Sequence, residues 1–233
     1  MTFNYSENKK QSFVNAIQTA LMKAKDMHSN NNLTCKNGLA LYTLNFIFKE
    51  LELIRDDTIE VIPFKQGPFE QALIYDNEYK TLISLTSQNN LKRLKSRKFV
   101  DRMHYIDALL SFNESLPCDK QMTFLEGDLE SFADYKERLK KEIERFVRQK
   151  EIDFYMILEH KIFYKDFAIV KAKAKVLSPE YALIFTEDWS NYIKPTYDFV
   201  LMDDSFTNEA PKQTKDSPYV KERELPVTLK NRS

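Results

Sequence analysis

Only three of the 233 residues are glycine, Gly38, Gly67 and Gly127, where average usage would give about sixteen. Many catalytic loops depend on backbone conformations that glycine adopts far more easily than other residues. Three scattered glycines cannot form the glycine-rich turn of a dinucleotide-binding fold, a P-loop or the nucleophile elbow of a hydrolase. The sequence also contains no H-E-x-x-H, C-x-x-C or EF-hand motif. The signatures of several large enzyme classes are therefore missing.

The composition is typical of a folded domain with no overall charge. Hydrophobic residues make up 42% and aromatic residues 13% of the chain, which is enough apolar surface for a core. Lysine plus arginine and aspartate plus glutamate each total 35, so the formal net charge is zero. A neutral chain has no general attraction for nucleic acid or an anionic membrane, and any such binding must come from a local patch.

The beginning of the chain and its two cysteines indicate the compartment. The polar run 4–11 differs from the charged start and apolar stretch of a signal peptide, and no uncharged apolar run reaches the length of a membrane span. Cys35 and Cys118 lie far apart in the sequence. We therefore expect a cytoplasmic protein with reduced thiols and no membrane contact.

Apolar spacing separates helices from strands along the chain. The helical period predicts an N-terminal helical pair and three later helices, at residues 6–27, 39–54, 88–95, 99–113 and 127–150. Runs rich in β-branched and aromatic residues predict two groups of strands, at residues 58–64, 70–75 and 79–86, and at residues 152–164, 167–176 and 181–186. Short turns make the first group an antiparallel meander. Since each group alone would be a marginal sheet, we expect an α+β fold in which the groups at about 58–86 and 152–187 share one antiparallel sheet packed with helices.

The composition changes near residue 202. Residues 1–202 are expected to form a single α+β domain. Residues 203–233 are polar and contain three prolines, which predicts a flexible C-terminal tail. Residues 220–229 regain short apolar spacing, so this segment is either a frayed end or a strand-like clip that docks on this domain or on a partner.

Six cations fall within eleven residues of the middle of the chain: Lys92, Arg93, Lys95, Arg97, Lys98 and Arg102. Such a run could bind phosphates, because each neutralised phosphate releases counterions and adds affinity. A solvated connection between two helices explains the run somewhat better, because aromatic residues for base stacking are not regularly interleaved and Phe99 alone falls within the run.

A second set of cations, Lys171, Lys173 and Lys175, alternates with small apolar residues in an expected strand. Alternate residues of a strand lie on one face about 6.6 Å apart, which resembles the spacing of phosphates along a nucleic-acid strand. The same pattern describes the solvent face of an antiparallel strand whose other face carries Val170 and Val176. The solvent-face interpretation holds unless this stripe adjoins the first run of cations in space.

Glu159 and Lys161 form an E-x-K tripeptide at the end of an apolar strand. Metal-dependent nucleases use this pattern, in which the carboxylate binds Mg²⁺ and the ammonium helps to position water. Asp76, at the end of another expected strand, is the best candidate for a further carboxylate. The tripeptide is a weak signal, because a chain with 30% charged residues contains several by chance.

His104 has aspartates three residues to either side, Asp101 and Asp107, within an expected helix. A carboxylate at that spacing could orient the imidazole for acid–base chemistry. A local surface interaction is the commoner role for such a pair, and the sequence places no serine or cysteine nucleophile beside it.

Two stretches are similar to a known family. Ile62-Pro63-Phe64-Lys65-Gln66-Gly67-Pro68-Phe69 and Met103-His104-Tyr105-Ile106-Asp107-Ala108-Leu109 resemble an uncharacterised bacterial family, domain of unknown function 5986. The resemblance covers the middle of the chain. It implies a bacterial cytoplasmic protein of a kind often encoded beside mobile or defence genes, and it carries no catalytic residues.

The missing catalytic motifs and the neutral charge favour a binding or regulatory protein without enzymatic activity. We expect weak, non-specific contact with nucleic acid through the cationic residues, or a protein partner, and no cofactor or bound metal. A divergent Mg²⁺-dependent nuclease using Asp76, Glu159 and Lys161 is the alternative hypothesis.

Overall fold

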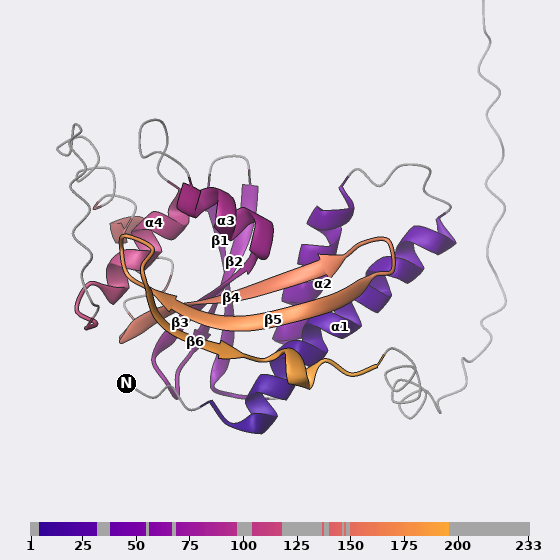
Figure 1. Ribbon diagram of the computed structural model, residues 1–233, viewed down its shortest axis with the longest axis horizontal. Coiled ribbons are helices and arrows are strands. Elements are labelled where there is room, and N and C mark those ends of the chain that lie inside the picture. The colour runs from indigo at the N-terminus through magenta and orange to yellow at the C-terminus, as the bar shows by residue number, and fades with distance from the viewer. Residues whose placement is uncertain are drawn as a thin grey trace, which may run out of the picture. The chain divides into compact units, whose positions relative to one another are not determined.

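The computed structural model describes most of the chain as far as Pro195. The described residues are 5–31, 38–54, 56–66, 69–96, 104–117, 137, 140–145, 147 and 150–195, all within one compact unit. Their helices and strands are, in chain order, α1 (Glu7–Asn30), α2 (Leu39–Glu52), β1 (Ile59–Gln66), β2 (Phe69–Asp76), β3 (Thr81–Ser87), α3 (Gln88–Ser96), α4 (Tyr105–Leu110), the short helix η1 (Ser111–Asn113), β4 (Phe154–Phe163), β5 (Ala168–Leu177), β6 (Leu183–Asp188) and the short helix η2 (Ser190–Tyr192) (Figure 1). Residues 140–145 are also helical. The expected tail, residues 203–233, lies outside the described residues.

The N-terminal helical pair forms where the apolar spacing predicts it. Ser6 caps α1, because its hydroxyl accepts a hydrogen bond from the backbone N–H of Lys9 at 3.3 Å. The predicted stripe that includes Phe13 and Ile17 is fully buried. Helix α2 follows Gly38, whose φ of 81° favours glycine. None of the helices described has both the length and the apolar character needed to span a membrane.

Six strands form one sheet in the order β1-β2-β3-β4-β5-β6. As expected, the first three strands are an antiparallel meander, and both strand groups share the sheet. The two groups meet where β3 pairs with β4, and this pair is parallel, with Ile83 opposite Met156. Parallel neighbours need a crossover connection, and this one contains α3, α4 and η1. The α+β fold class is confirmed, with one parallel pair that the sequence did not predict.

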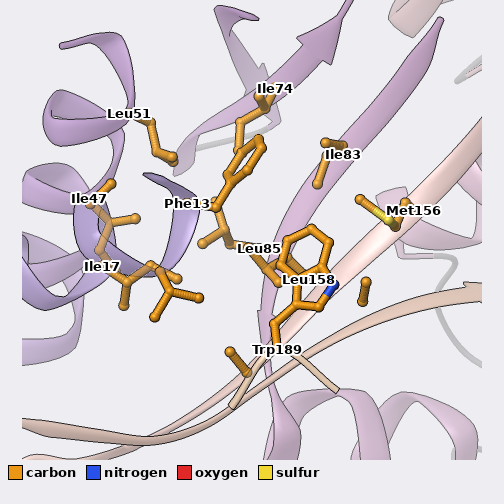
Figure 2. Close-up of a cluster of buried hydrophobic side chains, with 14 of the residues drawn as sticks. Phe13, Ile17, Ile47, Leu51, Ile74, Ile83, Leu85, Met156, Leu158 and Trp189 are labelled. Atoms are coloured by element: carbon orange, nitrogen blue, oxygen red, sulfur yellow. The ribbon is translucent and has the colours of Figure 1, made fainter. Parts of the chain in front are cut away.

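Helices α1 and α2 cover one face of the sheet. Figure 2 shows large apolar side chains that converge there from both helices and from the strands, among them Phe13, Ile47, Ile83 and Leu158. Trp189, which follows β6, is fully buried in the same cluster. Full burial of each such side chain stabilises the fold by about 1.5–3 kcal/mol. These contacts hold the helical pair on the sheet.

The opposite face of the sheet carries a second apolar cluster with α3, α4 and part of the predicted long helix. Leu82 of β3 and Ile157 of β4 belong to this cluster together with Leu91 of α3 and Ile143. Only residues 137, 140–145, 147 and 150 of the predicted helix 127–150 are described. Both faces of the sheet are therefore covered by helices over part of their area.

Asn113 anchors the crossover to the sheet. Its amide group donates hydrogen bonds to the backbone carbonyls of Tyr155 at 2.9 Å and Leu177 at 2.8 Å. Its side-chain oxygen accepts a hydrogen bond from the backbone N–H of Tyr155 at 2.7 Å. The Asn113 side chain is buried and fully bonded, so it links β4 and β5 where their ladder ends.

Lys9 forms a buried ion-pair cluster that joins α1 to the turn between β2 and β3. Its ammonium nitrogen lies 2.8 Å from carboxylate oxygens of both Asp76 and Glu78 and 3.6 Å from one of Asp56. It also donates a hydrogen bond to the Thr58 hydroxyl at 2.9 Å. Burial alone would lower the pKa of Lys9, but its hydrogen bonds to Asp76 and Glu78 raise the pKa above its ordinary value. Lys9 therefore stays charged although its side chain is only 3% exposed.

The next residue, Lys10, joins α1 to β6. Its ammonium lies 2.5 Å from Glu187 Oε1, and the other oxygen of this carboxylate accepts a hydrogen bond from the indole N–H of Trp189 at 2.8 Å. About two turns further along α1, the Gln18 amide donates a hydrogen bond to the backbone carbonyl of Lys194 at 2.8 Å. Two consecutive buried lysines thus fix one helix to two separate parts of the sheet.

The predicted alternation of β5 holds from Lys171 onward and is interrupted at Val170. The register shifts there, so that Ile162 of β4 pairs with Ile169. Ile169 consequently takes the buried position at 5% exposure, whereas Val170 is 41% exposed. The prediction that Val170 lies on the apolar face is wrong, because a bulge adds one residue that the period-2 pattern does not contain.

Replacing Lys9 with methionine should lower the free energy of unfolding by about 3–5 kcal/mol, because Asp76 would remain buried without its counter-charge. Chemical denaturation would measure the loss. Lys49→Met is the matched control, since Lys49 and Glu52 form an exposed pair on α2 whose loss costs less than about 1 kcal/mol. The double variant Lys9→Met/Asp76→Asn should recover part of the lost stability. Equal effects of Lys9→Met and Lys49→Met would contradict a structural role for the Lys9 cluster.

Candidate functional site

A cavity of about 740 Å³ opens where the parallel strands β3 and β4 both end. We call it the edge cavity. Its walls come from the last residues of these strands, from the starts of α3 and α4, and from α2. Its volume lies within the range of small-molecule sites. In open sheets, ligands commonly bind beyond the carboxyl ends of parallel strands, which is where this cavity lies.

One wall of the edge cavity is polar and cationic. It contains the side chains of Arg93 and Lys161 and the first turn of α3, from Gln88 to Asn90. Arg93 donates a hydrogen bond to the Asn90 side-chain oxygen at 2.8 Å. Among the described residues that line the cavity, none is aspartate or glutamate. The local charge is therefore positive in a protein whose net charge is zero.

The opposite wall is apolar. Helix α2 contributes Leu41, Leu44 and Ile47, and the strands contribute Leu85 and Ile162. Leu41 is 57% exposed, so apolar surface reaches the mouth of the cavity. The aromatic side chains in the lining are those of Tyr105, Tyr164, His104 and His160. A cationic wall facing an apolar wall suits a molecule with one anionic and one apolar part.

Two buried polar side chains of the lining have unsatisfied hydrogen-bonding atoms. His160 is 7% exposed and Thr86 is 3% exposed, and both line the edge cavity. Among the described residues, neither His160 Nδ1 nor the Thr86 hydroxyl has a hydrogen-bond partner. Burial lowers the pKa of His160 from 6.5 to about 4, against the smaller opposing effects of the Leu158 backbone and Glu159. His160 is therefore neutral at pH 7 and can both donate and accept a hydrogen bond.

Helix α3, which holds the described part of the first run of cations, packs on the face of the sheet that carries Ile157 and its β5 neighbour Lys175. The pKa of Lys95 on α3 is lowered by loss of hydration and, second, by the charge of Lys175 on β5, while Glu159 acts in the opposite direction. The lysine stripe therefore adjoins the first run of cations. We call the described members of both sets the cationic face: Lys92, Arg93, Lys95, Lys171, Lys173 and Lys175. The other predicted members, Arg97, Lys98 and Arg102, lie outside the described residues.

Part of the cationic face is neutralised by acids. Lys175 lies 2.7 Å from Glu159, and Lys173 lies 2.9 Å from Asp188 on the neighbouring strand. Burial alone would raise the pKa of Asp188, but hydrogen bonds from Ser190 and the pair with Lys173 lower it to about 2. Within the described residues, Lys92, Arg93, Lys95 and Lys171 form no ion pair with a carboxylate. The positive charge available to a ligand therefore concentrates on α3 and at Lys171.

The residues of the nuclease alternative do not converge. Glu159 is buried and pairs with Lys175, whereas Lys161 is exposed and lies opposite Lys171. Asp76 pairs with Thr81 of β3, and Thr81 pairs with Phe154 of β4. Glu159 lies five residues, or about 16 Å, further along β4. Asp76 also belongs to the Lys9 cluster. Within the described part of the chain, no group of three or more histidines, cysteines or acids is placed to hold a metal.

His104 lies at the start of α4 rather than inside a helix. Its Nδ1 accepts a hydrogen bond from the backbone N–H of Ile106 at 3.3 Å, and Asp107 Oδ2 accepts one from the backbone N–H of His104 at 2.6 Å. This reciprocal arrangement is a capping box. Asp107 also accepts a hydrogen bond from the Tyr181 hydroxyl at 2.5 Å. The spacing of His104 and Asp107 therefore fixes a helix start, and Asp101 lies outside the described residues.

Sequence patterns gave no sign of the edge cavity. Arg93 and Lys161 were recognised, but as members of a phosphate-binding run and a nuclease motif. His160 occupies a buried position of β4, where the sequence pattern of a core histidine and of a cavity histidine is the same. Only the parallel pairing of β3 with β4 places these residues around one cavity.

Fold and site define an α+β protein with a mixed sheet and an edge cavity. The chain belongs to a family of unknown function, DUF5986, and the sequence model of this family matches residues 2–231. The similarity seen in the middle of the chain thus extends over nearly all of it. No curated protein and no solved structure matches the chain.

His160 should make the stability of the protein depend on pH. Because its pKa is about 4 in the fold and near 6.5 in an unfolded chain, the unfolded state binds the proton first as pH falls. This contribution to stability is complete above pH 6.5 and is lost toward pH 4, with a size on the order of 2–3 kcal/mol. His160→Leu should remove this part of the pH dependence in denaturant unfolding compared at pH 7.5 and 4.5. Parallel pH profiles of the two proteins would show that His160 is not held neutral.

Proposed function

We propose that this protein binds nucleic acid weakly and without sequence preference through the cationic face. The observation that carries the proposal is that α3 packs on the face of the sheet that carries Ile157 and its β5 neighbour Lys175. The charge of Lys175 accordingly adds to the loss of hydration that lowers the pKa of Lys95. Cations from two distant segments therefore act on the same region of space. Attraction for phosphates, with release of counterions, is the chemistry that such a region offers.

Charge and hydrogen bonding give the face its binding groups. Arg93 carries a planar guanidinium that can hold a phosphate with two hydrogen bonds. Lys92, Lys95 and Lys171 add point charges that form no ion pair among the described residues. Neither α3 nor β5 contains an aromatic residue that could stack on bases, so contact with the backbone and little sequence preference are expected. The proposed location is the bacterial cytoplasm, and residues 1–202 form the proposed binding domain. The gene would lie beside mobile or defence genes, as the family resemblance implies.

Removal of a lysine that has no ion pair should weaken binding more than removal of a lysine that a carboxylate already neutralises. Lys95→Ala and Lys171→Ala should each reduce the slope of log affinity against log salt by about one. Lys173→Ala is the matched control on the same strand face, since Asp188 already neutralises Lys173, and its effect should be smaller. Fluorescence anisotropy with a labelled single strand and duplex, between about 50 and 200 mM salt, measures this. Binding that is absent at low salt, or that ignores salt, would refute the proposal.

Glu159→Gln separates this proposal from the nuclease alternative. The substitution removes the partner of Lys175, so nucleic-acid binding should become tighter and its salt slope steeper by about one. A nuclease that needs the Glu159 carboxylate would instead lose cleavage in Mg²⁺ or Mn²⁺. A melting curve shows whether the variant is folded. Weaker binding by a folded Glu159→Gln protein would contradict the assignment of Lys175 to the binding surface.

A further inference from the structure

We propose that the edge cavity binds a small phosphate monoester with a planar organic body, the class to which nucleoside monophosphates belong. This site is separate from the cationic face, with which it shares only Arg93. The inference does not depend on nucleic-acid binding, because the cavity is lined mainly by other residues.

The charge of the lining selects an anion. Arg93 and Lys161 supply two positive charges, and no acidic side chain among the described lining residues opposes them. A phosphate monoester carries about −1.5 to −2 charges at pH 7, which two cations balance better than they balance a monocarboxylate. The first turn of α3, a nine-residue helix, also lines this wall, and the N-terminus of a helix favours a phosphate.

Two buried polar atoms of the lining can form hydrogen bonds with a bound molecule. His160 Nδ1 and the Thr86 hydroxyl have no hydrogen-bond partner among the described residues, and both residues are more than nine-tenths buried in the lining. Buried polar groups without partners are rare in native proteins, because each gives up hydration and gains nothing in return. Groups of a bound molecule would supply the missing hydrogen bonds.

The apolar wall determines what kind of organic group the bound phosphate monoester can carry. Leu41, Leu44 and Ile47 of α2 face a cavity of about 740 Å³, which is far larger than a phosphate ion. Inorganic phosphate would leave this wall exposed to water. Tyr105 and Tyr164 add aromatic surface to the lining, and aromatic rings pack well against a planar ring. A body with one planar ring system and a hydrogen-bonding edge fits the apolar wall and His160, which lies on the same face of the sheet as Leu158, whereas Thr86 lies on the face of α3, toward the phosphate.

Isothermal titration calorimetry on the full chain tests the inference with four probes: adenosine monophosphate, adenosine, inorganic phosphate and decanoate. Adenosine monophosphate should bind at least tenfold more tightly than each of the other three. Arg93→Ala should weaken its binding at least tenfold, since the guanidinium is one of the two cations of the site. Lys92→Ala is the control, because Lys92 neighbours Arg93 on α3 but does not line the cavity.

Two substitutions on α2 test the site without touching the cationic face. Leu44→Trp should block the cavity, and Leu41→Glu should repel the phosphate by placing a carboxylate at an exposed position of the lining. Leu41→Glu keeps the test valid if Leu44→Trp fails to fold. Both variants should bind adenosine monophosphate at least tenfold more weakly and still bind oligonucleotides. Lys92→Ala should instead weaken oligonucleotide binding and leave the affinity for adenosine monophosphate unchanged. Failure of nucleic-acid binding alone would leave this inference intact.

Three results would overturn the inference. The first is no detectable binding of adenosine monophosphate to the folded protein. The second is binding that Arg93→Ala and Leu41→Glu leave unchanged. The third is tighter binding of decanoate, which would assign the cavity to an aliphatic carboxylate.

Discussion

The parallel pairing of β3 with β4 is the constraint on which the functional part of this structure depends. It joins a meander near the N-terminus to a second strand group nearly seventy residues later in one sheet. Because both strands run in the same direction, both end at the same edge, and α3 begins there directly after Ser87. Arg93 therefore lies near the ends of two strands, and Lys95 lies near the lysine stripe of β5. An antiparallel pair would place these ends on opposite edges and form neither the cavity nor the cationic face.

The buried lysines of α1 determine which surfaces remain for function. Lys9 and Lys10 hold α1 against the β2–β3 turn and β6, and the apolar cluster between α1, α2 and the sheet closes most of that face. Burying an ammonium is costly unless carboxylates surround it, and Asp76 is committed to this task. Acids that resemble catalytic groups in the sequence, Asp76 and Glu159, are thus used to neutralise buried or half-buried lysines.

Local sequence patterns predicted the helices and strands well, but not how these elements pair and pack together. The N-terminal helical pair and the strands of both groups could be predicted, because each depends on residues close in sequence. The direction of pairing between β3 and β4 was not, since a period-2 pattern is the same for parallel and antiparallel neighbours. Lys9 looked like any solvated charge on an amphipathic helix, because its carboxylates come from residues 56–78. The edge cavity could not be predicted for the same reason: each of its walls comes from a different segment.

The distribution of ion pairs explains how a neutral protein can still attract anions. The lysines of β5 nearest the sheet interior, Lys173 and Lys175, are matched by Asp188 and Glu159. Among the described cations that have no such partner, Arg93 and Lys161 line the cavity at the carboxyl ends of β3 and β4. Screening in salt water limits each exposed charge to a range of about 10 Å, so the attraction acts at this edge and not over the whole surface. Arg93 lies at the overlap of cavity and cationic face, so a phosphate bound in the cavity and a nucleic-acid backbone on the face would compete for the same guanidinium.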